Sequence, residues 1–271
     1  MIEHFQQMNP ALEMTLNPHV EKRVKRMIRG GRRGTEIFLG RSATFFPVFE
    51  AYLEAYDLPT ELKYLSVVES ALKQDAKSKA GAAGLWQFMP RTGKAYGLDI
   101  NQQVDERLDL FKSTESAVRY LADLHKSFKD WPLALAAYNC GPGRVRKAMK
   151  ERRSRDFWNI RSLLPKETQD YVVKWMATTY VMSYYYFYDL RPAYPDYDLQ
   201  FIKAIKIYSS KSLTRISKET GAPIAVLRKL NPSYKQGIVP SNPYGNFVVV
   251  PKIGLIKEYD EMDIQAVSLK Q

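Results

Sequence analysis

A glutamate lies within an apolar helical stripe, and this feature most constrains what the chain can fold into. The segment 58–72 carries apolar residues at helical spacing. The residues on one face of that helix are Leu62, Leu65, Glu69 and Leu72. A carboxylate on a buried face is costly unless it is paired, hydrogen-bonded or protonated. The pattern therefore predicts either a structural glutamate with a partner or a functional carboxyl group whose pKa is raised by burial.

Size and composition indicate an ordinary globular protein. A chain of 271 residues suits one large domain, or a main domain with a small module. Hydrophobic residues make up 45% and charged residues 26%, and no apolar run is long enough to span a bilayer. The net charge of +12 favours an acidic polymer as partner, whether nucleic acid, an anionic membrane surface or bacterial cell wall.

Two residue classes narrow the choice of partner and chemistry. The strongest basic cluster, at 22–33, suits either nucleic acid or a solvated helix face before a glycine turn. We favour the second and expect no nucleic acid as partner, because no nucleic-acid-binding motif accompanies the cluster. Cys140 is the only cysteine, which excludes an intramolecular disulfide and a multi-cysteine zinc site. The histidines, His4, His19 and His125, are scattered, so we expect neither a metal site nor a cofactor.

Hydrophobic periodicity divides the chain into a long helical part and a short mixed part. Helices are expected at 20–28, 44–56, 58–72, 113–128, 131–139 and 167–188. A linker signal at 191–195 follows. Strand-like runs at 201–208 and 246–250 then enclose helical patterns at 213–220 and 224–230. The fold class is therefore mainly α, followed by a small α+β module.

Four motifs together resemble a known family. They are ES at 69–70, GLWQFMP at 84–90, AAYNCGPG at 136–143 and PKETQDYV at 165–172. In this order and spacing they resemble the catalytic domain of soluble-type lytic murein transglycosylases, which has a lysozyme-like fold. The resemblance covers roughly residues 45–181.

The regions on either side resemble the D type of membrane-bound murein transglycosylases. In that type the catalytic domain precedes LysM modules, which bind N-acetylglucosamine polymers. Residues 212–232 are similar to the LysM helix pair, and 248–251 suit its second strand. SKS at 210–212 replaces the usual Gly-Asp-Thr turn, so the module is LysM-like and its glycan binding stays open.

These observations imply five regions. We expect an N-terminal helical extension at 1–43, a lysozyme-like transglycosylase domain at 44–190 and a linker at 191–200. A LysM-like module at 201–253 and a charged tail at 254–271 complete the chain.

The resemblance assigns Glu69 as the single catalytic acid and base. The substrate-binding residues that it implies are Ser70, Ser78, Gln87, Met89, Tyr138, Asn139, Glu167 and Tyr171. Glu167 has an alternative role in capping a helix or pairing with Lys166 or Arg161. Trp86 and Phe88 are expected in the core rather than the cleft. The aromatic run 184–188 is expected to pack at the domain junction rather than to stack on sugars.

The reaction implied is lytic cleavage of the β-1,4 bond between N-acetylmuramic acid and N-acetylglucosamine. It leaves 1,6-anhydromuramic ends and serves cell-wall turnover. Ordinary glycosidases use two carboxyl groups. The candidates for a second carboxyl group, by closeness to Glu69 in the sequence, are Asp75, Asp99, Asp105 and Glu106. All four lie outside the motifs. A goose-type lysozyme-like hydrolase and a catalytically idle peptidoglycan-binding protein remain as alternatives.

The expected partner is the glycan strand of peptidoglycan, and the expected state is a monomer. A wall substrate places the protein in the bacterial periplasm or cell envelope. The sequence opens without an apolar export signal, so we expect that such a signal has been removed. Membrane association and the choice between exo and endo cleavage stay open.

Overall fold

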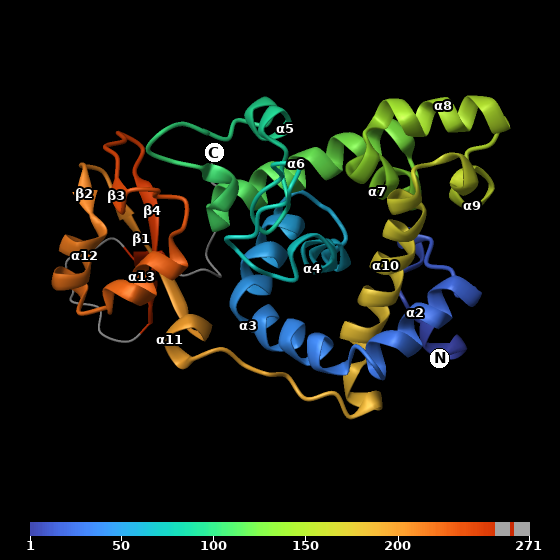
Figure 1. The fold of residues 1–271 in the computed structure, drawn as a ribbon, viewed down its shortest axis with the longest axis horizontal. Coiled ribbons are helices and arrows are strands. Elements are labelled where there is room, and N and C mark those ends of the chain that lie inside the picture. The colour runs from blue at the N-terminus through green and yellow to red at the C-terminus, as the bar shows by residue number, and fades with distance from the viewer. Residues whose placement is uncertain (253–260, 263–271) are drawn as a thin grey trace.

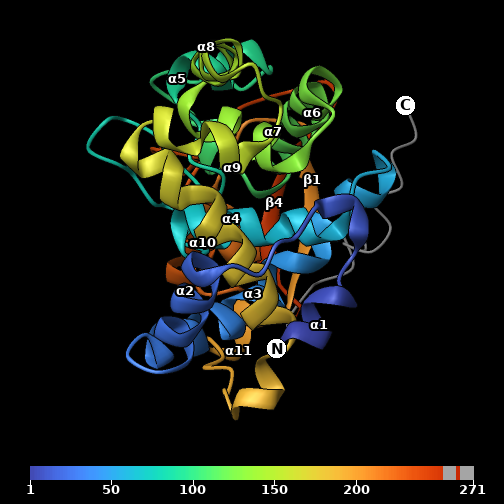
Figure 2. The same ribbon diagram turned by 90° about the vertical axis from the view of Figure 1, so that its right-hand side faces the viewer.

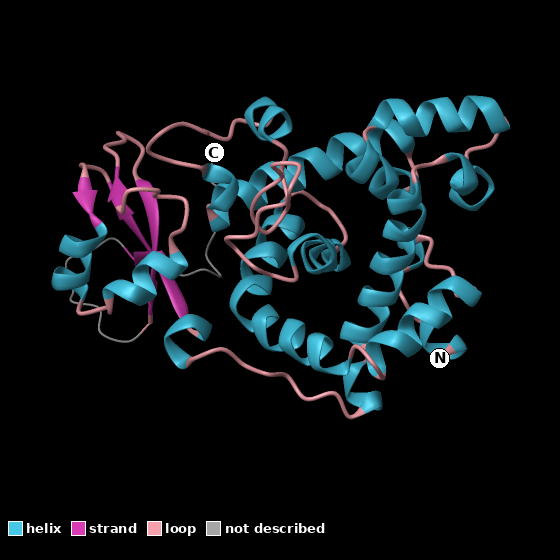
Figure 3. Ribbon diagram, in the orientation of Figure 1, coloured by secondary structure: helices cyan, strands magenta, loops and turns pink. Residues whose placement is uncertain are grey.

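Helices form most of the molecule and strands gather at one end of it. A computed structural model describes residues 1–252 and 261–262 (Figure 1). The helices are α1 (Ile2–Gln6), α2 (Pro18–Ile28), α3 (Arg32–Ala55), α4 (Tyr64–Ser70), α5 (Pro90–Ala95), α6 (Leu110–Phe128), α7 (Trp131–Cys140), α8 (Pro142–Arg152), α9 (Phe157–Ile160), α10 (Lys166–Ser183), α11 (Tyr197–Gln200), α12 (Leu213–Thr220) and α13 (Ile224–Leu230). The strands are β1 (Ile202–Ile207), β2 (Lys211–Ser212), β3 (Ile238–Val239), β4 (Asn246–Pro251) and β5 (Glu261–Met262). Figure 3 shows the strands in magenta at one end of the molecule and the helices in cyan throughout it.

The short helix α4 lies at the centre of the helical part. Figure 1 shows it end-on, with α3 on one side and α10 on the other, and α4 contacts α10 directly. Leu62 and Leu65 are fully buried, as their position in the apolar stripe predicts. The helix therefore carries Glu69 out of the core at its C-terminal end, next to α10.

Two long helices differ from their predicted limits. α3 begins at Arg32 rather than Thr44 and continues through Pro47, so the boundary predicted at 43/44 lies inside one helix. α10 ends at Ser183, and the aromatic run after it forms a 3₁₀ turn instead of more α-helix. Both differences arise where tertiary packing, rather than local periodicity, decides the backbone conformation.

The aromatic run packs mainly against the N-terminus. The Tyr188 hydroxyl lies 2.7 Å from that of Tyr180, and the ring of His4 stacks on Phe187 at 4.5 Å between centroids. Tyr186 and Phe187 are nevertheless more than half exposed. The run thus contacts α1 and α10, with part of its aromatic surface facing solvent.

The C-terminal module follows the predicted strand, helix, helix, strand order. β1 is the central strand of an antiparallel sheet in the order β4-β1-β5, with Ile202 opposite Pro251 and Ile207 opposite Asn246. Helices α12 and α13 have the predicted bounds. Ser212 caps α12 by accepting a hydrogen bond from the Arg215 N–H at 3.2 Å, so the SKS turn starts the helix without Gly-Asp-Thr. Most of the predicted tail at 254–271 lies outside the described residues, and its described part forms β5.

The module packs tightly against the helical part. The strands lie behind the helices in Figure 2. Asp105 N–H donates to the Ser233 carbonyl at 2.9 Å, and Lys235 N–H donates to Gln103 at 3.0 Å. The ring of Phe111 lies 5.1 Å from that of Phe247. No helix in the described part of the chain combines the length and apolar character that a membrane span needs.

Candidate active site

Glu69 occupies the last turn of α4. The helix stops there because Ala71 and Leu72 adopt left-handed backbone angles, with φ of 53° and 57°. Leu72 thus leaves the helical stripe, although its side chain stays buried. The Glu69 carboxyl is half-buried and accepts a hydrogen bond from the Tyr171 hydroxyl on α10. This geometry places the carboxyl group against the phenol of Tyr171 at the edge of the core.

The pKa of Glu69 is raised from its usual value to about 7, chiefly because burial disfavours the carboxylate. The hydrogen bond from Tyr171 lowers the pKa, since it stabilises the charged form. The negative charge of Glu167 raises the pKa further, and the positive charge of Lys174 lowers it. At neutral pH the group is therefore present in both protonation states, which suits a residue that donates and then accepts a proton.

Two tyrosines flank Glu69 and retain their protons. Burial raises the pKa of Tyr171 well above its usual value, and the charge of Glu69 adds to the rise. The same two causes, in the same order, raise the pKa of Tyr138. The Tyr138 hydroxyl donates to the Trp86 carbonyl at 2.7 Å, which fixes its ring beside the motif at 84–90. Both phenols are therefore neutral hydrogen-bond donors.

The loop 76–89 carries three of the predicted site residues, Ser78, Gln87 and Met89. Gln87 has a φ of 49°, and its side-chain N–H groups donate to Ala76 and Gly84 carbonyls at 3.2 and 2.9 Å. Its amide nitrogen thus holds the loop together, which leaves the side-chain oxygen to face a ligand. Met89 is 42% exposed at the end of this loop, as a contact for substrate requires.

Two predicted serines have structural contacts. Ser70 is buried, and its hydroxyl lies 3.0 Å from both the Ser66 and Leu85 carbonyls, so it joins α4 to the loop. Ser78 lies in an exposed turn and accepts a hydrogen bond from the Ala82 N–H at 3.0 Å.

Asn139 and Glu167 lie on the α7 and α10 side of the site. The Thr168 hydroxyl donates to the Asn139 side-chain oxygen at 2.7 Å, which orients the amide. Glu167 is exposed in the first turn of α10, where its charge favours the helix dipole. Within residues 1–252 it makes no ion pair with Lys166 or Arg161, and Arg161 instead pairs with Asp170 at 3.4 Å.

Three residues near the site were not predicted as part of it. Thr168 and Lys174 act on Asn139 and Glu69 as described above. The ring of Tyr120 lies 5.1 Å from that of Tyr138. In the helix predicted at 113–128, Tyr120 is an aromatic residue among the aliphatic positions Ala117, Leu121 and Leu124, and this is the signal that the sequence offers.

Two of the other carboxyl groups considered from sequence, those of Asp105 and Glu106, have different partners. Asp105 pairs with Arg107 at 2.8 Å, and Glu106 accepts from the Asp99 N–H at 2.7 Å and binds Lys112. Trp86 and Phe88 are buried, as predicted, and the Trp86 indole N–H donates to Thr114 at 3.0 Å. Glu167 is therefore the carboxylate whose charge bears on Glu69.

Two family models match the chain at the positions that this geometry singles out. Residues 46–161 match the Transglycosylase SLT domain, which includes Glu69, the loop 76–89 and α7. Residues 202–255 match the LysM-like domain of lytic transglycosylase MltD. The chain combines an SLT transglycosylase domain with an MltD-type LysM-like domain. The predicted fold class, a mainly α lysozyme-like domain followed by a small α+β module, is confirmed.

The chain is similar to transglycosylases of Escherichia coli and of a phage. The chain is 35% identical over 202 residues to membrane-bound lytic murein transglycosylase D of Escherichia coli K12, which covers 72% of this chain and 44% of that protein. It is 37% identical over 109 residues to peptidoglycan transglycosylase gp16 of Escherichia phage T7, covering 39% of this chain and 8% of the phage protein. The 70 kDa soluble lytic transglycosylase of Escherichia coli has a similar structure, with a TM-score of 0.45 and 28% identity, over 54% of this chain and 24% of that one. The chain thus spans less than half the length of the curated relatives named here.

Proposed function

We propose that the protein is a peptidoglycan lytic transglycosylase that uses Glu69 alone as acid and then as base. The observation that carries this proposal is the half-buried Glu69 carboxyl group, with a pKa of about 7 and a hydrogen bond from Tyr171. The SLT domain match and the transglycosylase relatives support the same reaction class. The substrate is the glycan strand of the wall, and the site of action is the bacterial periplasm or cell envelope.

In the first step protonated Glu69 donates its proton to the oxygen that links N-acetylmuramic acid to N-acetylglucosamine. The bond from that oxygen to the anomeric carbon then breaks. The acetamido group of the muramoyl residue stabilises the positive charge that develops on this carbon. The neutral phenol of Tyr171 donates a hydrogen bond to the reacting carboxyl group, so it favours the ionised form as the proton leaves.

In the second step Glu69, now ionised, removes the proton from the C6 hydroxyl of the same muramoyl residue. The C6 oxygen bonds to the anomeric carbon, which gives the 1,6-anhydro product and returns Glu69 to its protonated form. Because this hydroxyl belongs to the reacting sugar, it has a large entropic advantage over a water molecule. The residues proposed to hold the strand are Ser78, Gln87, Met89, Asn139 and Glu167, with Ser70 fixing the loop from below.

The test is mass spectrometry of the soluble products released when the purified protein digests peptidoglycan sacculi. The wild type is expected to release anhydromuropeptides. Glu69→Gln, which keeps the size of the side chain but cannot donate a proton, is expected to lower the rate by about 1,000-fold. Reducing-end muropeptides would identify a hydrolase instead, and binding to sacculi without product would identify a glycan-binding protein.

Glu167 offers the sharpest control for the hydrolytic alternative. A hydrolase with two carboxyl groups would use Glu167 to activate water, because it is the carboxylate whose charge reaches Glu69. For the transglycosylase, Glu167→Gln is expected to lower the rate by less than about tenfold, with the anhydro product unchanged. A loss as large as that of Glu69→Gln would contradict the mechanism with a single carboxyl group.

A further inference from the structure

The LysM-like domain is joined by hydrogen bonds to the segments that flank and support the active-site loop 76–89. Gln74, just after α4, is buried, and its side-chain N–H groups donate to the Leu108 carbonyl at 3.0 Å and to the Leu230 carbonyl at 3.2 Å. Leu230 is the last residue of α13 in the LysM-like domain. One side chain from the start of the active-site segment thus binds the backbone of both neighbouring elements.

Arg107 makes the second connection. Its guanidinium group donates to the Gly81 carbonyl at 2.7 Å and to the Phe88 carbonyl at 3.1 Å, which lie near the middle and the end of the loop 76–89. The same group pairs with both Asp105 carboxylate oxygens, at 2.9 and 2.8 Å. Arg107 is buried, so these bonds are shielded from water and hold the loop firmly.

At Gly84 the backbone of the loop and the backbone of Arg107 are in close contact. A Cβ atom at Gly84 would lie 1.8 Å from the Arg107 carbonyl oxygen, and the residue has a φ of +86°. The backbone of the loop therefore rests directly on the backbone of Arg107. Gly84 also donates its N–H to Ala76 at 2.9 Å and accepts from Gln87, the proposed substrate contact.

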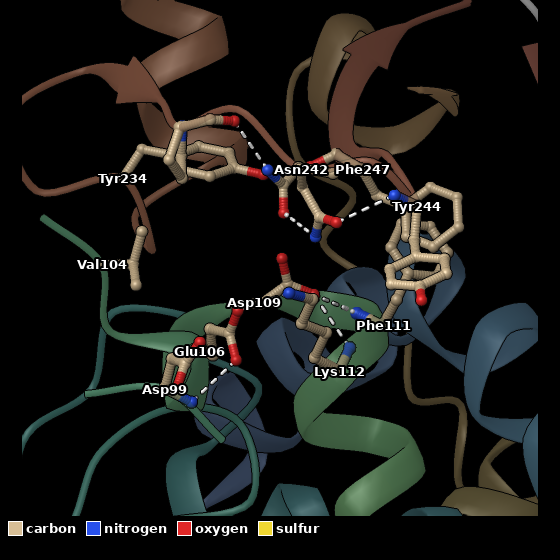
Figure 4. Close-up of polar contacts among 12 residues, drawn as sticks. Asp99, Val104, Glu106, Asp109, Phe111, Lys112, Tyr234, Asn242, Tyr244 and Phe247 are labelled. Atoms are coloured by element: carbon tan, nitrogen blue, oxygen red, sulfur yellow. Dashed lines mark hydrogen bonds and ion pairs between the residues drawn. The ribbon is translucent and has the colours of Figure 1, made fainter. Parts of the chain in front are cut away.

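The LysM-like domain fixes the other side of this support. Asp105 N–H donates to Ser233 at 2.9 Å, and Val104 packs in the hydrophobic core of the LysM-like domain beside Tyr234. Figure 4 shows Val104, Glu106 and Asp109 facing Tyr234 and Asn242 across the contact between the two domains. A continuous series of backbone and side-chain contacts therefore runs from the LysM-like domain through Asp105 and Arg107 to the loop.

We propose that the LysM-like domain braces the active site, and that Gln74 and Arg107 are positioning residues that hold the loop 76–89 over Glu69. This inference rests on the proposed function for its kinetic consequence. Glu69 itself stands on α4, outside the braced loop, so its proton chemistry does not depend on the brace. Gln87 and Met89 stand on the loop, so their grip on the glycan strand does.

The first test is Gln74→Met in the full chain, a change that keeps the length of the side chain and removes both donors. With soluble glycan strands as substrate, the apparent KM is expected to rise about tenfold while kcat and the pH profile stay close to wild type. Hydrogen exchange is expected to speed up at the Gly84 and Phe88 amides, whose hydrogen bonds lie within the loop. Arg107→Lys is expected to have the same effects, because lysine cannot reach Asp105 and both carbonyls together.

Thr44→Val is the matched control. The buried Thr44 hydroxyl also joins the SLT domain to the C-terminal part, at 2.9 Å from the Leu199 carbonyl, but it does not touch the loop. It is expected to lower stability and leave KM unchanged. The inference is overturned if Gln74→Met leaves KM and loop exchange at wild-type values, if it lowers kcat alone, or if Thr44→Val raises KM equally. The exchange result is independent of catalysis, so it separates failure of the brace from failure of the proposed reaction.

Discussion

Burying the Glu69 side chain lowers the stability of the fold whenever its carboxyl group is charged. Its folded-state pKa of about 7 lies above the usual value of 4.5 because burial disfavours its charge. Its sequence position in a leucine stripe predicted either a paired structural glutamate or a functional carboxyl group with a raised pKa, since any carboxylate there loses water. The phenol that binds it could not be located from periodicity, because Tyr171 reaches it only through the packing of α10 on α4.

This cost makes stability depend on pH in a defined direction. Below about pH 4.5 the carboxyl group is protonated in both states, and as pH rises to 7 the unfolded chain ionises first. The free energy of unfolding therefore falls across pH 4.5–7. Glu69→Gln is expected to raise it by about 1–3 kcal/mol at pH 8 and to leave it almost unchanged at pH 4. Urea unfolding at both pH values measures this, and equal effects at the two would contradict the raised pKa.

The pH dependence of the rate should follow the same group. Because catalysis begins with protonated Glu69, kcat/KM is expected to fall about tenfold per pH unit above pH 7. Tyr171→Phe removes the hydrogen bond that lowers the Glu69 pKa, so the fall should begin at higher pH, with a lower maximal rate. Tyr138→Phe is the control, since the Tyr138 hydroxyl binds Trp86 and not Glu69. A downward shift in Tyr171→Phe would contradict this assignment.

Among the helices and strands, the bounds of short segments with clear hydrophobic periodicity were predicted best. Helices α12 and α13 have their predicted bounds because each is a single amphipathic stretch between clear turn residues. The start of α3 was missed because glycines and basic residues at 30–34 and Gly40 indicate a loop when considered locally. In the fold Gly40 allows the linker to approach, since a Cβ atom there would lie 1.8 Å from the Ala193 carbonyl oxygen. Only that distant contact explains the glycine.

The loop 76–89 depends on one glycine in the same way. Gly84→Ala would place a methyl group against the Arg107 backbone and strain a left-handed residue, so we expect a loss of about 3 kcal/mol or more in stability. Gly141→Ala is the matched control, because its φ is +90° with nothing within 4 Å of the added atom. It should cost about 1–2 kcal/mol. Thermal unfolding of both variants measures the difference, and equal losses would show that close packing at Gly84 is unimportant.

At the scale of the molecule, the hydrophobic core of the SLT domain extends into the LysM-like domain, which also has a core of its own. Leu230 and Val249 of the LysM-like domain belong to the same buried cluster as Leu62 and Leu65 of the SLT domain. The sequence predicted two units and a linker between them, and nothing in its periodicity showed that they pack together. Contacts between elements far apart in the chain lie beyond what local patterns encode.

A core that extends into both domains implies that the domains unfold together. Calorimetry of the full chain is expected to show a single transition, with equal calorimetric and van't Hoff enthalpies. Gly40→Ala, which would push the linker off α3, should lower the midpoint of that transition and split it. Two separate transitions in the wild type would contradict a common core.

The fixed position of the LysM-like domain also affects how the protein can bind a polymer. A module on a flexible tether samples many positions and raises the local concentration of its target at all of them. Here the Ser233, Leu230 and Phe247 contacts hold the module in one place. A glycan strand that contacts both domains must therefore match a single spacing and direction. The two domains would then select strands by their geometry instead of only raising the local concentration of the strand.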